Sequence, residues 1–337
     1  MTEDVELKVR RVPMSHFISD EAKAALAQPR PVVLDRGQQP PLDDVEAWRA
    51  YIRQANQFME QMQALILPML AVDIERTTLN GVRAAWVRPR NPSPEFANRV
   101  LMNIHGGAFI LGEGSVMEAA VVAHFGGVDV LAVDYRVPPD HPFPANLEDT
   151  IGAYRALLET HKPKDIAVFG TSAGGTYTLT TILKARELGL PLPAAAGICT
   201  PAIELSGRRG YSGDTLVTND GLDVLSGSAP AEGEERDGGA TALFVGKADV
   251  EDPLVSPIYG DYEKGFSPSY LLSGTRDMLL SSTALIHRKL HRAGVPCELH
   301  VFEAMQHGFQ MNIQVPEARE AVFDMLRFFR KWMDAEG

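Results

Sequence analysis

The sequence contains little cysteine and no long apolar run, and each shortage excludes a class of protein. Only two cysteines, Cys199 and Cys297, occur among 337 residues, so we expect neither a disulfide framework nor a cysteine-based metal site. Both fall within predicted buried strands, where a thiol packs as a small apolar side chain. No run reaches the roughly 20 apolar residues of a membrane-spanning helix, and the start, MTEDVELKVRR, lacks the apolar centre of a secretion signal. We therefore expect a cytoplasmic protein that does not span a membrane and holds no metal.

Positive charge is also in deficit. The chain has 44 acidic residues against 32 lysines and arginines, and its formal net charge is −12. This balance argues against nucleic acid or an anionic membrane surface as a partner. Hydrophobic residues make up 45% of the chain, which is enough for a sizeable core. The length fits one large α/β domain or two small ones.

From residue 72 onward, short apolar runs alternate with helical patterns. A hairpin opens this region, because Asn80-Gly81 is a strong turn signal between two strand-like runs. The alternation after it predicts a mostly parallel sheet with helices on both faces, and no internal repeat is visible. We expect eight strands, at residues 72–77, 82–88, 99–104, 128–133, 166–169, 194–199, 269–273 and 297–302, the first pair antiparallel. We expect helices at residues 115–125, 144–159, 177–188, 279–293 and 316–333.

Two segments do not follow this alternation. Residues 1 to about 70 carry one long helical pattern, at 42–67, and we interpret them as a helical cap segment ahead of a catalytic domain at 71–337. Phe58, Met59 and Met62 lie on the apolar side of that helix. They either pack on the body of the protein or also roof a substrate pocket. The second segment, at about 204–240, is rich in glycine, serine and acids; we interpret it as a mobile lid, with a plain surface insertion as the alternative.

The chain is organised around residues 166–176, which read IAVFGTSAGGT. A short apolar run, a G-x-S-x-G motif and a helical pattern follow one another, as a nucleophile elbow requires. Ser172 would stand on a turn so sharp that large side chains two positions before and after it are excluded. Its hydroxyl would then project from the sheet beside the N-terminus of a helix. A glycine-rich turn without chemistry remains the alternative until partners are found.

A serine nucleophile needs a histidine base and a carboxylate that orients it. Of nine histidines, His307 alone lies in a loop directly after the last predicted strand. Asp277 follows the strand at 269–273, at the same carboxyl edge of the sheet, and the order Ser, Asp, His is that of α/β-hydrolases. Asp249 and Asp252 are rival acids, but they precede a strand, so we interpret them as structural or substrate-side groups.

An oxyanion hole is predicted from backbone donors. His105-Gly106-Gly107-Ala108 follows a strand, and its glycines leave N–H groups unobstructed. The N–H groups of Gly106, Gly107 and Ala173 are the three expected donors. A tight turn without this role is the alternative.

In chain order, six motifs resemble the bacterial hormone-sensitive lipase family of α/β-hydrolases: HGGAF, VDYRVPPDHPFPANLED, GTSAGG, DPLVSP, SGTRDMLL and QHGF. The resemblance covers about residues 72–337, and the N-terminal helical part is similar to the cap of that family. It implies an α/β-hydrolase fold and a cofactor-free carboxylesterase acting on short- to medium-chain acyl esters. By position, it makes Ser172 the nucleophile, Asp277 the acid and His307 the base, and His105 would hold the glycine loop in shape.

The sequence departs from the family pattern at two positions. The family loop commonly reads His-Gly-Gly-Gly, whereas Ala108 stands last here, so the hole should work if Ala108 avoids positive φ. The elbow more often has Asp before the serine, whereas Thr171 stands here, as in a subgroup with GTSAG. The change should affect packing and charge near the serine and leave the chemistry intact.

Other functions remain open at this stage. An amidase or peptidase would use the same triad, and a long-chain lipase would favour a more apolar lid than the acidic segment here. A non-catalytic ligand-binding relative would be expected to have lost a triad member, and none is missing. A dehydrogenase would need a dinucleotide fingerprint, which Gly106-Gly107-Ala108 does not fit. The expected partner is a small-molecule ester, and whether the chain forms a homodimer is left open.

Overall fold

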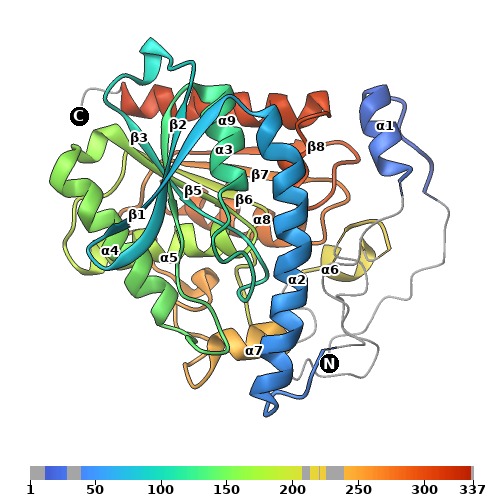
Figure 1. Cartoon of the computed structure of the whole chain (residues 1–337), viewed down its shortest axis with the longest axis horizontal. Helices are drawn as coiled ribbons and strands as arrows, with labels where there is room; N and C mark the ends of the chain where they lie inside the picture. The colour runs from blue at the N-terminus through green and yellow to red at the C-terminus, as the bar shows by residue number, and fades with distance from the viewer. Residues whose placement is uncertain (1–11, 29–38, 207–212, 220, 225–238, 335–337) are drawn as a thin grey trace.

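The computed structural model describes residues 12–28, 39–206, 213–219, 221–224 and 239–334. Within these ranges, no helix is long and apolar enough to cross a bilayer. Figure 1 shows a central twisted sheet with helices on both of its sides, above and below it in this view. This arrangement is the α/β-hydrolase fold that the sequence predicts.

The sheet has eight strands in the order β1-β2-β4-β3-β5-β6-β7-β8. Their bounds are β1 Val72–Leu79, β2 Val82–Pro89, β3 Val100–Ile104, β4 Asp129–Val133, β5 Ile166–Thr171, β6 Ala195–Cys199, β7 Ser269–Gly274 and β8 Cys297–Phe302. β2 pairs antiparallel with both β1 and β4, and the remaining pairs are parallel. The carboxyl ends of β3, β5, β6 and β7 therefore meet at one edge, where ligands bind in such sheets.

Helices cover both faces, as predicted. α3 (Met117–Gly126) and α9 (Pro316–Met333) pack on one face, and α4 (Ala145–Thr160), α5 (Ala173–Glu187) and α8 (Leu280–Arg292) pack on the other. β3 and β5 lie in the middle and every residue of both strands is buried, which explains why they read as continuous apolar runs. Short 3-10 turns occur at Leu67–Met69, Pro94–Phe96, Pro163–Asp165, Pro257–Tyr259 and Phe309–Met311.

The N-terminal region holds two described helices rather than the one predicted. α2 (Val45–Ile66) matches the expected helix, and Asp44 caps it by accepting from the Ala47 N–H at 3.0 Å. α1 (Asp20–Leu26) was not predicted, because seven residues are too few for a helical period to show. The Ser19 hydroxyl donates to Glu317 of α9 at 2.7 Å, so α1 is tied to the body of the fold.

Two further details differ from the prediction. α5 begins at Ala173, four residues before the predicted start at Tyr177, because Gly174 and Gly175 belong to its first turn. Cys297 is only partly buried rather than fully so, since β8 is an edge strand with a single neighbour, whereas Cys199 is buried as expected. α6 (Thr215–Thr218) and α7 (Gly239–Val245) lie within or beside the predicted lid; residues 225–238 fall outside the described chain.

Candidate active site

Ser172 lies on a strained turn between β5 and α5. Its φ is 60° and its ψ is −121°, a conformation that L-residues rarely adopt. A Cβ on Gly170 would lie 2.3 Å from the Ile104 carbonyl oxygen, and a Cβ on Gly174 would lie 1.9 Å from the same atom. Only glycine fits at either position, so the G-x-S-x-G spacing is a steric requirement of this turn.

The turn places Ser172 at the N-cap of α5. The Ser172 N–H donates to the Cys199 carbonyl at 2.9 Å, which fixes the turn to the neighbouring strand β6. Ala173 is the first residue of the helix, and the first N–H groups of a helix have no intrahelical acceptor. These N–H groups and the helix dipole favour negative charge beside Ser172.

Asp277 and His307 meet at the same edge of the sheet. Asp277 follows β7, its side chain is fully buried, and its Oδ1 lies 3.1 Å from His307 Nδ1. The Leu279 N–H donates to Asp277 Oδ1 at 2.9 Å and the Ser273 hydroxyl donates to Oδ2 at 2.6 Å. The carboxylate is thus held in one orientation before any substrate arrives.

The His307 imidazole is almost fully buried, and its environment favours the protonated form. Burial alone would lower the pKa of His307, but the charge of Asp277, its hydrogen bond and the charge of Asp223 together raise that pKa above its ordinary value. Because Nδ1 points to Asp277, Nε2 is the ring nitrogen that remains for a reacting group.

A chain of hydrogen bonds connects the His307 loop to the elbow. Gln310, three residues after His307, donates from Nε2 to the Thr171 hydroxyl oxygen at 2.7 Å. Thr171 in turn donates to the carboxylate of Glu118 on α3. The residue before the nucleophile is therefore fixed by groups from two other elements.

The predicted oxyanion loop lies against Ser172. A Cβ on Gly106 would lie 3.4 Å from Ser172 Cβ and 2.6 Å from the Thr171 carbonyl oxygen, so glycine is needed for this approach. The N–H groups of Ile110 and Leu111 both donate to the Gly107 carbonyl, which closes the loop as a tight turn. Gly106 thus lies against Ser172, Gly107 follows it in the same loop, and Ala173 follows the serine directly at the start of α5.

Ala108 does not meet the condition set by the sequence analysis. Its φ is 49°, and Phe109 after it has a φ of 71°, so both lie in the left-handed region. This conformation costs about 1 kcal/mol for alanine. The loop keeps it because Phe109 and Ile110, the next two residues, are buried, and their packing outweighs this cost.

His105 supports this loop rather than facing the serine. Its Nδ1 lies 2.8 Å from the Gly106 carbonyl, and Tyr135 stacks on its ring with centroids 4.1 Å apart. The Tyr135 hydroxyl donates to the His105 carbonyl at 2.8 Å. Burial lowers the pKa of His105, so the ring is neutral near pH 7 and suits the structural role expected of it.

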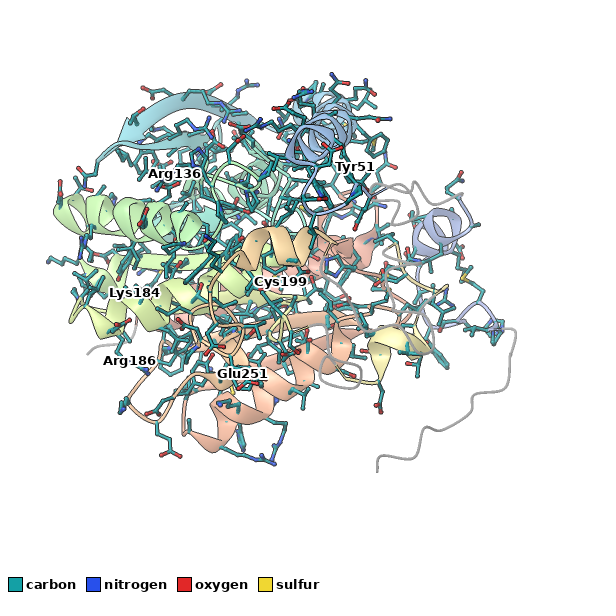
Figure 2. All side chains as sticks on the ribbon, turned by 90° about the horizontal axis from the view of Figure 1, so that it is seen from below. Tyr51, Arg136, Lys184, Arg186, Cys199 and Glu251 are labelled. Carbon is teal, nitrogen blue, oxygen red and sulfur yellow. The ribbon has the colours of Figure 1, made fainter. Side chains whose placement is uncertain are left out.

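α2 holds the far side of the oxyanion loop. Asn56 Oδ1 accepts from the Gly112 N–H at 3.0 Å, and Gln63 Oε1 accepts from the Val116 N–H at 2.9 Å. A small apolar cluster, made of Trp48, Ile52, Ala55, Ile110 and Leu111 with Tyr51, Met59, Ala240 and Leu243 packed on it, joins α2 to this loop and to α7. Figure 2 labels Tyr51 and views α2 nearly along its axis, with α7 beside it.

The three predicted pocket residues of α2 have different surroundings. Met59 packs on the cluster that contains Ile110 and Leu111, next to the oxyanion loop. Phe58 is partly buried, whereas Met62 is 42% exposed. Of the three, Met59 is the one that belongs to the cluster joining α2 to this loop.

The rival acids have structural surroundings. Asp249 Oδ1 accepts from the Glu251 N–H at 3.0 Å and Asp252 Oδ1 accepts from the Leu254 N–H at 2.8 Å, so each caps a local turn. A third carboxylate, Asp223, does lie beside His307 and was missed by the sequence analysis, which assigned no role to any residue of the segment at 204–240.

Asp223, Asp277 and His307 each offer one atom that could bind a metal, and these three atoms lie within 4.8 Å of one another. Such a group can hold a metal ion in general. Here His307 Nδ1 is bonded to Asp277, and both oxygens of Asp223 accept from backbone N–H groups. We therefore interpret the group as a histidine with two supporting carboxylates.

Glu118 is the other functional candidate that sequence reasoning missed. It is buried on α3 in the otherwise apolar run MEAAVVAHF, and a lone carboxylate in such a run was the available signal. Burial raises the pKa of Glu118 to about 7, although the hydrogen bonds of Thr171 and Asn103 oppose that shift.

Comparison with known proteins agrees with this geometry. A profile of the alpha/beta hydrolase fold family matches residues 101–311. An acetyl-hydrolase of Streptomyces hygroscopicus is 30% identical over 73% of this chain and 78% of its own. The crystal structure of the esterase E25 superimposes with a TM-score of 0.87 at 32% identity, over 98% of this chain and 99% of that one. An esterase from the bacterial hormone-sensitive lipase family gives a TM-score of 0.71 at 26% identity, over 94% and 99% of the two chains.

The chain therefore belongs to the α/β-hydrolase family, in the bacterial hormone-sensitive lipase group of esterases. It is a carboxylic ester hydrolase.

The buried Glu118 predicts a pH-dependent stability. Since its folded-state pKa is raised from 4.5 to about 7, the folded protein binds more protons than the unfolded chain in that interval. Stability should then fall as pH rises from 4.5 to 7, by roughly 3 kcal/mol from this group. Glu118→Gln should remove this loss. In urea titrations, the free energy of unfolding of the variant, relative to wild type, should therefore be higher at pH 8 than at pH 5. Glu60→Gln, at an exposed position of α2, is the control and should leave the pH dependence of stability as in wild type. If Glu118→Gln showed the same pH dependence as Glu60→Gln, the prediction would be contradicted.

Proposed function

We propose that Ser172, Asp277 and His307 hydrolyse esters through an acyl-enzyme. His307 Nε2 takes the proton of the Ser172 hydroxyl as the oxygen attacks the ester carbonyl carbon. The resulting imidazolium then gives that proton to the departing alcohol, and the acyl group stays on Ser172. Water, activated by the same imidazole, attacks the acyl-enzyme and releases the acid.

The observation that carries this proposal is the Asp277–His307 pair at the edge where Ser172 begins α5. Nδ1 and Oδ1 are 3.1 Å apart, and the acid is fully buried. A buried carboxylate fixes the tautomer that leaves Nε2 unprotonated and stabilises the imidazolium that forms. The raised pKa of His307 means that activity should decline once acid protonates the ring.

The oxyanion that forms on the attacked carbonyl needs donors that are fixed in advance. We assign this role to the N–H groups of Gly106, Gly107 and Ala173. Gly106 lies against Ser172, and Ala173 begins α5, where the helix dipole adds to the local positive potential. Removing one donor from such a site typically costs about 3–4 kcal/mol of transition-state stabilisation.

The substrates that we propose are short- to medium-chain acyl esters. Apolar residues of α2 approach the glycine loop through Met59, and the acyl chain would lie against this side. The relatives include an acetyl-hydrolase, whose name indicates a small acyl group. An amide substrate would use the same groups, and a panel of matched esters and anilides separates the two.

Ser172→Ala tests the nucleophile. Alanine keeps the Cβ and adds no strain at φ 60°, so folding should be intact while the hydroxyl is lost. Turnover of p-nitrophenyl butyrate should fall to the background rate, with an unchanged circular dichroism melting curve. A variant that kept a tenth of wild-type turnover would rule out Ser172 as the nucleophile.

Asp277→Asn tests the acid. The substitution preserves shape but allows His307 to adopt the wrong tautomer, which lowers turnover by about 10⁴-fold in a comparable triad. Asp249→Asn and Asp252→Asn, which alter turn-capping acids, are the controls and should change kcat by less than about threefold. If folded Asp252→Asn lost more kcat than Asp277→Asn, the role of the acid would belong to Asp252 instead.

Met59→Ala tests the acyl site. Shortening this side chain should enlarge the apolar side of the pocket and move the preference gradually towards longer acyl chains, since a methylene contributes only about 1–3 kcal/mol. The measurement is kcat/KM for p-nitrophenyl esters from acetate to laurate. Met62→Ala, one turn along α2 at an exposed position, should leave the profile as in wild type. Unchanged profiles in both variants would mean that α2 only packs on the loop.

A further inference from the structure

The described part of the segment at 204–240 docks on the two loops that carry Asp277 and His307. Asn219 donates from Nδ2 to the carbonyls of Thr275 and Asp277 at 3.1 and 2.9 Å. The Thr215 hydroxyl donates to the Met278 carbonyl at 3.0 Å. Gln306 Nε2 donates to the Leu222 carbonyl at 2.5 Å. Residues 213–224, apart from 220, therefore contact both loops directly.

Asp223 lies at the centre of this contact. Its side chain is fully buried, its Oδ2 accepts from the Met278 N–H at 2.7 Å, and its Oδ1 accepts from the His307 N–H at 2.9 Å. One carboxylate thus bridges the residue after the acid and the base itself. The Val224 N–H also donates to Oδ1, at 2.6 Å. Two acceptor oxygens facing three N–H donors suit the ionised form of the side chain.

We propose that Asp223 is a positioning residue of the esterase: it fixes the Asp277 and His307 loops relative to each other and supplies a second negative charge beside His307. This role rests on the proposed function of His307 as the base. Asp223 acts through the histidine, so it orients the base without touching the ester. The segment that carries Asp223, which the sequence analysis interpreted as a lid, would then also hold His307 in place as the base.

The charges around His307 define what Asp223 adds. Asp277 and Asp223 both stabilise the imidazolium, and the two carboxylates also act on each other. Arg276, the cation next to Asp277, directs Nη2 to the Pro13 carbonyl at 3.2 Å. The pKa of Asp223 is raised above its ordinary value, because burial and the charge of Asp277 outweigh the charge of His307 and the N–H donors of Met278 and His307, which lower it.

Asp223→Asn is the test, read by the pH profile of kcat/KM on p-nitrophenyl butyrate. Nδ2 of asparagine cannot accept, so at least one of the three N–H groups that now donate to Asp223 loses its partner, and the negative charge is gone. The acidic limb of this profile, where kcat/KM falls at low pH, should move to lower pH by about half a unit or more. The reason is that neutral His307 then persists in more acid solution. The plateau kcat should fall by roughly tenfold, the effect of one hydrogen bond on a rate, with KM little changed.

Three variants make the result specific. Asp214→Asn removes the same charge at an exposed position of the same segment and should leave the limb unchanged. Thr215→Val weakens the docking without a change of charge, so it should lower kcat without moving the limb. Asp223→Glu keeps the charge on a longer side chain, and its limb should return towards wild type while kcat stays reduced.

The outcomes separate this role from the alternatives. A folded Asp223→Asn protein with a wild-type limb would overturn the proposal, and so would an equal shift in Asp214→Asn. If Asp223→Asn does not fold, Asp223→Glu decides: wild-type kcat would overturn the bridging role, whereas reduced kcat with a wild-type limb supports it. Activity in Ser172→Ala would refute the proposed function itself, whereas an inactive Ser172→Ala beside an unshifted Asp223→Asn refutes only the role of Asp223.

Discussion

The close approach of β3 and the start of α5 is the constraint on which this active site depends. The Ile104 carbonyl lies so near that a side chain at Gly170 or Gly174 would overlap it. This crowding holds Ser172 at positive φ, and the strain is sustained because buried strands on both sides keep the turn in place. The same contact brings the Gly106 loop, which follows β3, against the serine. Ser172 and the glycine loop, the proposed nucleophile and oxyanion donors, are therefore positioned by one steric fit.

The proposed acid and base, Asp277 and His307, are positioned differently, by hydrogen bonds from both neighbouring and distant parts of the chain. Asp277 receives bonds from Ser273 and Leu279, and the His307 loop is held through Gln310 at the elbow and Asp223 in the docked segment. Each element contributes one or two bonds, and one of them, from Gln310, goes to Thr171 directly before Ser172. Such an arrangement orders the base before substrate binds, which lowers the reorganisation that the reaction must supply.

The sequence predicted the parts of this protein that have a local signature. The eight strands, the elbow at Ser172 and the loops of Asp277 and His307 follow from apolar runs and from the order of elements. The positive φ of Ala108 could not be predicted, because it reflects the packing of Phe109 and Ile110 rather than any preference of alanine. Contacts across the chain were also invisible: Asp223 reaches His307 over 84 residues, and no periodicity records such a pair.

The bond between Thr171 and Glu118 ties together two positions that would otherwise be free to change separately. Relatives with aspartate before the nucleophile would place a second carboxylate where the threonine hydroxyl now donates to Glu118. Two buried carboxylates in contact cannot both be ionised, so one would have to hold a proton or be replaced. A change from threonine to aspartate is therefore expected to succeed only with a compensating change at position 118. The identity of the residue before the serine is thus coupled, through one hydrogen bond, to a buried position of α3.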